Sequence, residues 1–347
     1  MIINKLNKIV DKKTLTRFGS LLVNGNWWTA RQLSGNSYAF EYSVRHDTIS
    51  DKPLLIDIST SIKLGNAFGI DIENQKLNYN GATVSIGISE LDEDYPLEFI
   101  NFSTEKINAT ATIQASELLQ GLKTVSHAIG NRYDYGNILS TVNIELGDTV
   151  QFQATDGNRL AVYDGVGDVI NRGSFNIPRA AVVNIISLLE LLPASLDLTL
   201  VSDGKVFLIH GYSLRVIGDQ CQGTYPQIKQ FIKIESDTRV LEYDTKALYN
   251  ALESLKPLVN DVTNRVTFTR GSDAITADNG TVSLAGIGEL DFNISFNRKF
   301  LIDAIKIFKD KKINKVQLHV LGVIDRVVIP SNKFKLIVMP IRVNEQY

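Results

Sequence analysis

Four turn-forming dipeptides interrupt runs of alternating apolar and polar residues, and they constrain the fold of this chain more than any other feature. Each pairs Gly with Asn or Asp: Asn80-Gly81, Gly147-Asp148, Asp203-Gly204 and Asn279-Gly280. Apolar residues alternate beside each dipeptide, as in Val84, Ile86 and Ile88. Gly, Asn and Asp adopt the backbone angles of tight turns at low cost, so each dipeptide predicts an antiparallel β-hairpin. The alternation also predicts strands with one buried face.

Segments with helical spacing lie between these hairpins. Apolar residues recur every three or four positions in 115–129, 178–192, 245–258 and 297–308, more weakly in 57–68, and residues 2–13 resemble the remnant of another helix. The second helix of each third begins near Asp57, Pro178 and Asn297, about 120 residues apart. This period predicts three tandem α+β domains, each with two helices and antiparallel sheets, over 1–109, 110–236 and 237–347.

The composition is that of an ordinary globular protein. Of the 347 residues, 44% are hydrophobic and 21% are charged, which excludes disordered and collagen-like chains. The single cysteine, Cys221, cannot form an intramolecular disulfide, so a reducing compartment is the simplest setting. Neither a run of about 18 apolar residues nor a secretion signal is present. We therefore expect a cytoplasmic protein with no membrane partner.

The charges are unevenly distributed along the chain. The net charge of −2 counts weakly against a simple nucleic-acid-binding protein, which is usually basic. Residues 1–20 and 297–315 are nevertheless strongly basic, whereas residues 90–98 are acidic. A run of like charges is most often only a solvated face. The alternative is that the two basic runs share one surface.

The sequence contains no recognisable catalytic motif. GxxxxGK[ST], HExxH, CxxC and GxSxG are all absent, and the four histidines lack metal-ligand spacing. Asp156 could be interpreted as a catalytic acid, but an Asp-Gly pair more often forms a turn. We therefore expect neither a cofactor nor a catalytic site, and a hydrolase that uses Asp156 is the least favoured alternative.

Four segments of the chain match the signatures of one protein family. They are Ala154-Thr155-Asp156-Gly157-Asn158-Arg159-Leu160-Ala161, residues 223–226, residues 295–304 and residues 338–343. The first resembles the ATDGHRLA signature of the bacterial DNA polymerase III beta subunits, the DNA sliding clamps. The others resemble, in order, that family's Tyr-Pro junction, its FNxxYLLDAL helix start and its VMPMRL tail. The resemblance covers nearly the whole chain and is strongest from about residue 110 onward.

This resemblance implies a homodimeric ring of six domains around double-stranded DNA. Helices would line the hole and sheets would face outward, so a basic lining would attract phosphates without reading sequence. The implied partners are a replicative DNA polymerase, a clamp loader and other proteins with a clamp-binding peptide. The expected DNA contacts are Lys5, Lys8, Lys12, Lys13, Arg132, Tyr133, Tyr135, Arg298 and Lys299.

The resemblance also implies a pocket that binds a short linear peptide of each partner. Its residues would be Leu139, Thr155, Gly157, Asn158, Arg159, Leu160, Pro226, Phe231, Asn297, Phe300, Ile324, Val338, Met339, Pro340, Ile341 and Arg342. The pattern is an apolar cleft rimmed by arginines. The expected dimer interface joins the strand near Val84 and Ile86 to the segment near Leu255 and Leu258.

The chain departs from the family pattern at several points. Asn158 replaces a His, Phe300 replaces a Tyr, and Gln230 replaces an Arg beside the cleft. The first domain is shortened, and Trp27-Trp28 has no counterpart in the family pattern. The main alternative function is therefore a clamp-fold interaction or decoy module that binds partner peptides without encircling DNA.

Overall fold

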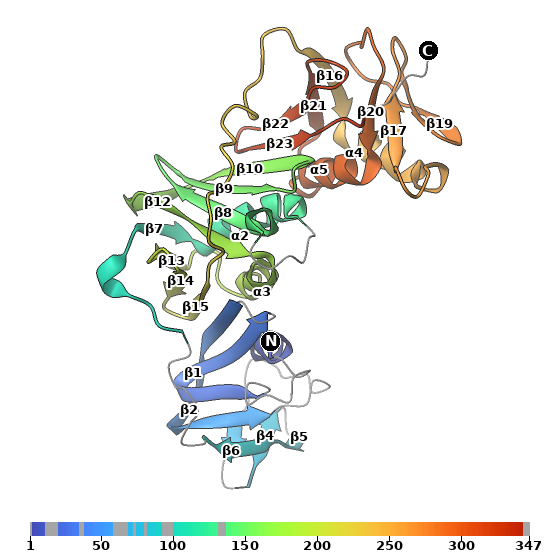
Figure 1. Cartoon of the computed structure of the whole chain (residues 1–347). Helices are drawn as coiled ribbons and strands as arrows, with labels where there is room; N and C mark the ends of the chain where they lie inside the picture. The colour runs from blue at the N-terminus through green and yellow to red at the C-terminus, as the bar shows by residue number, and fades with distance from the viewer. Residues whose placement is uncertain are drawn as a thin grey trace. The chain divides into compact units, whose positions relative to one another are not determined.

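The computed structural model describes residues 2–10, 20–34, 38–57, 69–71, 74–79, 82–91, 100–130 and 137–342 (Figure 1). The chain divides into two compact units. Unit 1 comprises Met1–Lys123, Arg132–Phe152 and Gly165–Thr224, and unit 2 comprises Thr124–Asn131, Gln153–Asp164 and Tyr225–Tyr347. The domain boundaries predicted at 109/110 and 236/237 stay predictions.

Unit 1 is built around a large antiparallel sheet with the strand order β1-β2-β15-β14-β13-β7-β11, in which β6 also pairs with β2. The strands are β1 (Leu21–Ser34), β2 (Tyr38–Asp57), β6 (Gly87–Glu90), β7 (Ala109–Gln114), β11 (Gly167–Asn171), β13 (Asp197–Ser202), β14 (Val206–Gly211) and β15 (Leu214–Asp219). A smaller sheet joins β3 (Gly69–Asp71), β4 (Lys76–Tyr79) and β5 (Ala82–Ser85), and β8 (Thr141–Leu146) pairs with β12 (Gly173–Pro178).

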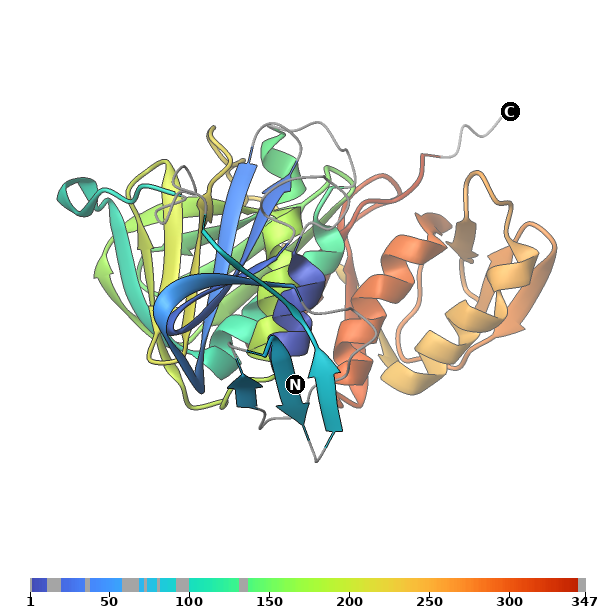
Figure 2. The same ribbon diagram turned by 90° about the horizontal axis from the view of Figure 1, so that it is seen from below.

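The helices of unit 1 lie close to the predicted positions. They are α1 (Ile2–Ile9), α2 (Ala115–Val125), whose last residues belong to unit 2, α3 (Arg179–Leu189) and the short 3₁₀ helices Thr104–Lys106 and Ile138–Ser140. Helix α1 packs beside α3 (Figure 2). The helix expected over 57–68 lies outside the described residues apart from Asp57, which ends strand β2.

Unit 2 contains two antiparallel sheets. The first has the order β10 (Arg159–Gly165), β23 (Phe334–Val338), β22 (Val327–Pro330), β21 (Lys315–Val320) and β16 (Arg239–Asp244); the second has the order β19 (Gly280–Ser283), β18 (Ala274–Ala277), β17 (Arg265–Phe268) and β20 (Ile294–Asn297). Its helices are α4 (Thr245–Ser254), α5 (Arg298–Asp310) and the 3₁₀ helices Ser126–Ala128 and Lys256–Leu258. Helices α4 and α5 pack against each other (Figure 2).

The predicted hairpins are present where the structure describes them. Strands β13 and β14 pair around Asp203-Gly204, and β18 and β19 pair around Asn279-Gly280. Strand β9 (Val150–Thr155) follows β8 across Gly147-Asp148. Strands β4 and β5 also pair, but the dipeptide Asn80-Gly81 between them lies outside the described residues. The α+β class predicted from the sequence is therefore confirmed.

One expected strand is divided between two sheets. The alternation of Val84, Ile86 and Ile88 predicts a single strand, but β5 ends at Ser85 and β6 begins at Gly87 in the large sheet. At the break, the Ile86 N–H donates to the Gln75 carbonyl at 3.0 Å. Ile86 itself is buried although it belongs to neither strand, so the alternation continues across the break without marking it.

The apolar stripes of the helices form the cores. On α5, Leu301, Ala304, Ile305 and Phe308 are almost fully buried, and the Phe308 ring meets the Phe334 ring edge to face at a centroid distance of 5.0 Å. Phe300, which was predicted to line the peptide pocket, is only half-buried. Among the described residues, no helix is both long and apolar enough to cross a membrane.

Candidate functional site

The motif segment 154–160 forms a tight loop between β9 and β10, and the loop is closed by its own side chains. The Thr155 hydroxyl donates to the Arg159 carbonyl at 2.6 Å and accepts from the Gly157 N–H at 3.1 Å. Asp156 Oδ1 accepts from the backbone N–H groups of Asn158 (2.9 Å) and Arg159 (3.0 Å). Gly157 has a φ of +88°, where an L side chain would be strained. Asp156 thus acts as a turn-forming residue, as its pairing with Gly predicts.

Arg159 connects this loop to helix α5. Its Nε donates to Asp156 Oδ2 at 2.9 Å, and its Nη1 donates to Asp303 Oδ2 at 2.6 Å. The guanidinium carbon also lies 4.6 Å from the centre of the Phe300 ring. Because the side chain is only 8% exposed, these partners compensate its charge within the protein. Arg159 is therefore an organising residue of the site rather than a free rim cation.

The C-terminal segment is tied to the same loop. Strand β23 pairs with β10 with Val338 opposite Arg159, and the Met339 N–H donates to the Asn158 carbonyl at 2.8 Å. Beyond it, Pro340 forms a β-bridge with Phe296, and the Ile341 N–H donates to the Ser295 carbonyl at 2.7 Å. The tail therefore runs from the motif loop to the strand that precedes α5.

The start of α5 is fixed by a side-chain cap. Asn297 Oδ1 accepts from the Lys299 N–H at 2.9 Å, as an N-cap does, and its amide donates to the Thr263 carbonyl at 3.3 Å. The cap places Phe300 and Asp303 one turn apart, on the side where Arg159 lies. Residues far apart in sequence thus converge on Arg159.

The linker, the segment 225–238 before β16, supplies part of the apolar surface of the site. Arg326 donates to the carbonyls of Gln230 (3.1 Å), Phe231 (2.7 Å) and Lys233 (3.2 Å), which holds this part of the linker in place. Phe231 is 42% exposed, Ile324 59% and Met339 37%, so three predicted pocket residues offer apolar surface to solvent. Pro226, Gly157, Asn158 and Arg342 are also exposed, whereas Leu160 and Val338 are buried.

The structure adds residues that the motif comparison did not select. Asp303 belongs to the helix-start motif, but only the fold reveals its bond to Arg159. Burial, reinforced by the positive charge of Arg159, lowers the pKa of His127 to about 3, so this imidazole is neutral. Burial likewise raises the pKa of Tyr225, whose hydroxyl lies at the backbone of Thr155. Leu139 belongs to unit 1, whereas the other predicted pocket residues belong to unit 2.

The predicted DNA contacts divide into three groups. Lys8 and Lys299 are exposed, and Lys5 is half-buried on α1. Lys12, Lys13, Arg132, Tyr133 and Tyr135 lie outside the described residues. Arg298, by contrast, is only 4% exposed.

Arg298 was predicted to contact DNA, and this prediction is wrong because its side chain is buried. Its Nη1 donates to the Leu252 carbonyl at 3.0 Å and lies 3.6 Å from Glu253 Oε1, so it stabilises the C-terminal end of α4. A basic run indicated a surface residue, but the first residue of α5 faces the neighbouring helix.

The predicted interface residues also need one correction. Leu255 is fully buried in unit 2, because it follows the last turn of α4 and completes the core, so it is not available to a partner chain. Leu258 is half-buried, and its side chain covers Gly280 on the edge strand β19. Val84 lies in β5 and Ile86 is buried.

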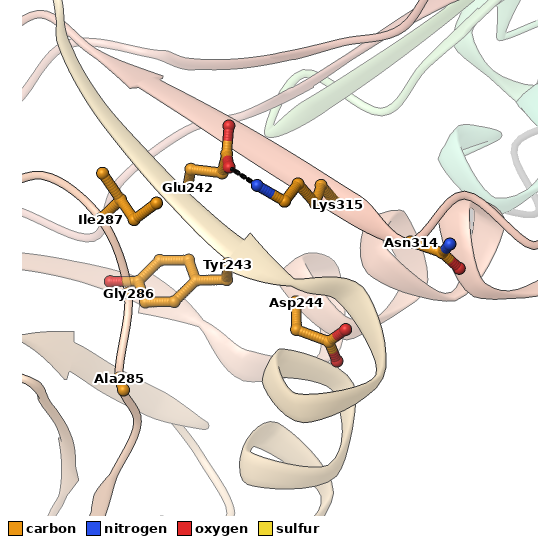
Figure 3. A pocket seen from close by; sticks show the side chains of 8 residues that line it. All are labelled: Glu242, Tyr243, Asp244, Ala285, Gly286, Ile287, Asn314 and Lys315. Atoms are coloured by element: carbon orange, nitrogen blue, oxygen red, sulfur yellow. Dashed lines mark hydrogen bonds and ion pairs between the residues drawn. The ribbon is translucent and has the colours of Figure 1, made fainter.

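A separate cavity of about 350 Å³ lies beside β16 (Figure 3). Glu242 accepts from Lys315 Nζ at 2.6 Å and from the Gln317 amide at 2.9 Å, and these bonds lower the pKa of Glu242. Figure 3 shows the Lys315 ammonium directed at this carboxylate and the Tyr243 ring beside Gly286. None of the predicted site residues that the structure describes lines this cavity. The described part of the chain also has no cluster of three or more His, Cys, Asp or Glu residues that could hold a metal ion.

The fold is that of the DNA polymerase sliding clamps. The chain superposes on the DNA polymerase III subunit beta from Pseudomonas aeruginosa with a TM-score of 0.79 and 17% identity, covering 99% of this chain and 97% of that one. The Thermotoga maritima DNA polymerase III beta subunit gives a TM-score of 0.78 at 17% identity, with coverages of 99% and 96%. A Pseudomonas aeruginosa sliding clamp bound to griselimycin gives 0.80 at 16% identity, with coverages of 98% and 96%.

Sequence comparison points to the same class of protein. The chain is 29% identical over 233 residues to the beta sliding clamp of Synechocystis sp., and the match spans 59% of this chain and 58% of that relative's length. No protein-family model matches the chain. Together, the structural and sequence likenesses confirm the resemblance to bacterial beta subunits that the motifs indicated.

Proposed function

We propose that this chain is a DNA polymerase processivity factor that works as a homodimeric ring around duplex DNA. The observation that carries the proposal is the clamp fold over nearly the whole chain, combined with the convergence of the family's motif segments on Arg159 in unit 2. The ring would slide along DNA while its peptide sites tether a polymerase, which raises the local polymerase concentration without any chemical step. We expect it to do so in the cytoplasm, after opening by a clamp loader.

Exposed lysines supply the proposed attraction for DNA. Helix α5 and the turn after it carry exposed Lys299, Lys306, Lys309 and Lys312, and α1 carries exposed Lys8. Of these, Lys306 is paired with Asp310, and Lys309 lies over the Tyr249 ring at 3.7 Å. Contacts between lysines and phosphates are independent of sequence and weaken steeply with salt, so they allow sliding. Lys12, Lys13, Arg132, Tyr133 and Tyr135 stay predicted contacts of the same kind.

The proposed peptide site uses the exposed apolar side chains of unit 2. Phe231, Ile324 and Met339 would hold apolar anchors of a partner peptide, and exposed Arg342 would pair with acidic residues beside the anchors. Phe300 lacks the hydroxyl that the family's Tyr would offer, so a peptide group bonded there in other clamps would lose that bond. A solved clamp of this fold is bound to griselimycin, which agrees with a ligand site on such a molecule.

Ring formation is tested by oligomeric state and by topology. Sedimentation equilibrium should give a dimer, and the chain should stay on nicked circular DNA after loading by a bacterial clamp loader with ATP. Cutting the circle once should release it, because a ring slides off an end. A monomer that is never retained on the circle would overturn the proposal and favour the decoy module.

The peptide site is tested separately by removing the tail. A chain that lacks residues 339–347 should remain a dimer yet lose stimulation of the polymerase, since the tail lies at the motif loop. Met339→Ala is the milder variant for the case in which the truncated chain does not fold. Full stimulation by both variants would show that the site is assigned wrongly.

A further inference from the structure

Neither tryptophan of the dipeptide Trp27-Trp28 takes part in the proposed DNA or peptide contacts. Trp28 is fully buried, and its ring meets the His46 ring at a centroid distance of 6.0 Å, so it serves the core of unit 1. Trp27 points to the other face of β1 and is only half-buried. It stands opposite Arg45 across the β1–β2 ladder. The two tryptophans therefore have different roles, and that of Trp27 is at the surface.

Arg45 lies between two aromatic rings. Its guanidinium carbon is 5.0 Å from the centre of the Trp27 ring and 4.5 Å from the centre of the Tyr212 ring. Tyr212 belongs to the turn between β14 and β15, and the Arg45 N–H donates to the Ser213 carbonyl at 3.1 Å, which holds that turn against β2. Strands β2 and β15 are neighbours in the sheet. The Trp27–Arg45–Tyr212 cluster is thus assembled from three separate parts of unit 1.

The charge of Arg45 has no carboxylate partner among the described residues. Two other arginines that stack on aromatic rings do have such partners: Arg159 pairs with Asp156 and Asp303, and Arg239 pairs with Asp291 at 2.8 Å. The Nε of Arg45, in contrast, is enclosed and has no hydrogen-bond partner in the part of the chain that the structure describes. A cation held between rings and left uncompensated is suited to an anionic ligand.

The outer face of the cluster is an open aromatic ring with polar surroundings. Tyr212 is 74% exposed, and its neighbours in the turn are Gly211 and Ser213. Arg215 on β15 is also exposed, and together with burial its charge lowers the pKa of His210. Asp47 is the acidic residue that stands nearest along β2. A protein hot spot built on Trp, Tyr and Arg is usually surrounded by contacts that exclude water, whereas Tyr212 stands exposed between Gly211 and Ser213.

We propose that the Trp27–Arg45–Tyr212 cluster binds single-stranded nucleic acid, with an unpaired base stacked on the exposed face of Tyr212 and its phosphate bonded to Arg45. Aromatic side chains bind bases in this way without selecting sequence, and arginine contributes both stacking and phosphate contacts. Duplex DNA keeps its bases inside the helix, so it offers no base to this ring. The site is therefore distinct from the proposed contacts of a ring with duplex DNA and does not depend on them.

The test measures binding of a fluorescein-labelled oligothymidylate to the full chain by fluorescence anisotropy. Tyr212→Ala should weaken binding about 5- to 150-fold, the range expected for loss of one stacked base. Tyr212→Phe keeps the ring and should bind like the parent chain. Arg45→Lys keeps the charge but loses the planar stacking group, so it should weaken binding as well.

A matched pair of controls uses Arg239, which also stacks on an aromatic ring. Arg239→Lys and Phe292→Ala alter a stacked pair whose charge is already compensated by Asp291, so both should leave binding unchanged. Retention of Tyr212→Ala on nicked circular duplex should equal that of the parent chain, which separates this site from ring function. Equal oligothymidylate binding by the parent and Tyr212→Ala, tighter binding of a duplex through Tyr212, or preference for an acidic peptide over the oligonucleotide would each overturn the proposal.

Discussion

Breaking the contact between Arg159 and Asp303 should reveal how strongly the motif loop is coupled to α5. The Arg159 side chain is 8% exposed and Asp303 is 43% exposed, and their 2.6 Å bond links segments 144 residues apart. Removing one partner of a buried pair costs about 3–5 kcal/mol, whereas an exposed pair contributes about 0.2–1 kcal/mol. Because one partner is buried and the other is half-exposed, we expect a coupling energy of about 1–2 kcal/mol.

The assay is a double-mutant cycle of Arg159→Met, Asp303→Asn and the double variant, followed by calorimetric thermal unfolding. Arg159→Met should lower the stability of unit 2 by about 3 kcal/mol, since it also removes the bond to Asp156 and the contact with the Phe300 ring. At about 2–4 °C per kcal/mol, this is a fall of about 6–12 °C in Tm. Asp303→Asn alone should cost about 1 kcal/mol.

The exposed pair of Arg239 and Asp291 provides the matched control cycle. Its side chains are 39% and 60% exposed, so the coupling between Arg239→Met and Asp291→Asn should stay below about 1 kcal/mol. If the Arg159–Asp303 coupling is no larger than that of the control pair, Arg159 does not organise the site and the reasoning is refuted.

Three further predictions concern Arg298, His127 and Gly121. Arg298→Ala should destabilise the chain by about 2–3 kcal/mol in thermal unfolding, because it removes the cap on α4. The control Lys299→Ala should change stability by less than about 0.5 kcal/mol, and equal effects of the two variants would contradict the burial of Arg298. The pKa of His127 is lower in the folded chain than the unfolded value of about 6.5, so the free energy of unfolding should fall by about 1.4 kcal/mol per pH unit as the pH drops below about 6.5. In unfolding scans between pH 7 and pH 5, His127→Gln should remove this slope. Gly121→Ala should lower Tm even though Ala favours helices, because the new Cβ would lie 2.5 Å from the Phe152 ring and the overlap costs about 1–3 kcal/mol. A higher Tm of the variant would show that the Phe152 ring moves aside freely.

Local sequence signals predicted most of the elements because they act over a few residues. The turn at Asp203-Gly204 and the apolar stripe of α5 depend only on backbone preference and on the spacing of apolar residues. The break at Ile86 was missed, since an alternation of residue types does not show which strand each residue pairs with.

The candidate site was predictable in its segments but not in its internal contacts. The motifs selected the loop around Arg159 and the start of α5, yet nothing in the sequence distinguishes Asp303 from other helical carboxylates until the fold places it beside Arg159. The same limit explains Arg298, which a basic run assigned to the surface. A charge pattern shows how charged residues are distributed along the sequence, but only tertiary packing decides whether each side chain lies in the core or at the surface.

The pairing of β10 with β23 has a consequence for how the chain is synthesised. Arg159 pairs with Val338, so β10 leaves the ribosome about 180 residues before the strand that pairs with it. At about 5–20 residues per second, this edge waits for about 9–36 seconds. During that interval its apolar segment Leu160, Ala161 and Val162 is an open strand edge, the kind of surface on which nascent chains associate wrongly. A chaperone that covers strand edges would therefore raise the yield of folded protein, and arrest of translation shortly before β23 would leave a chain prone to aggregation.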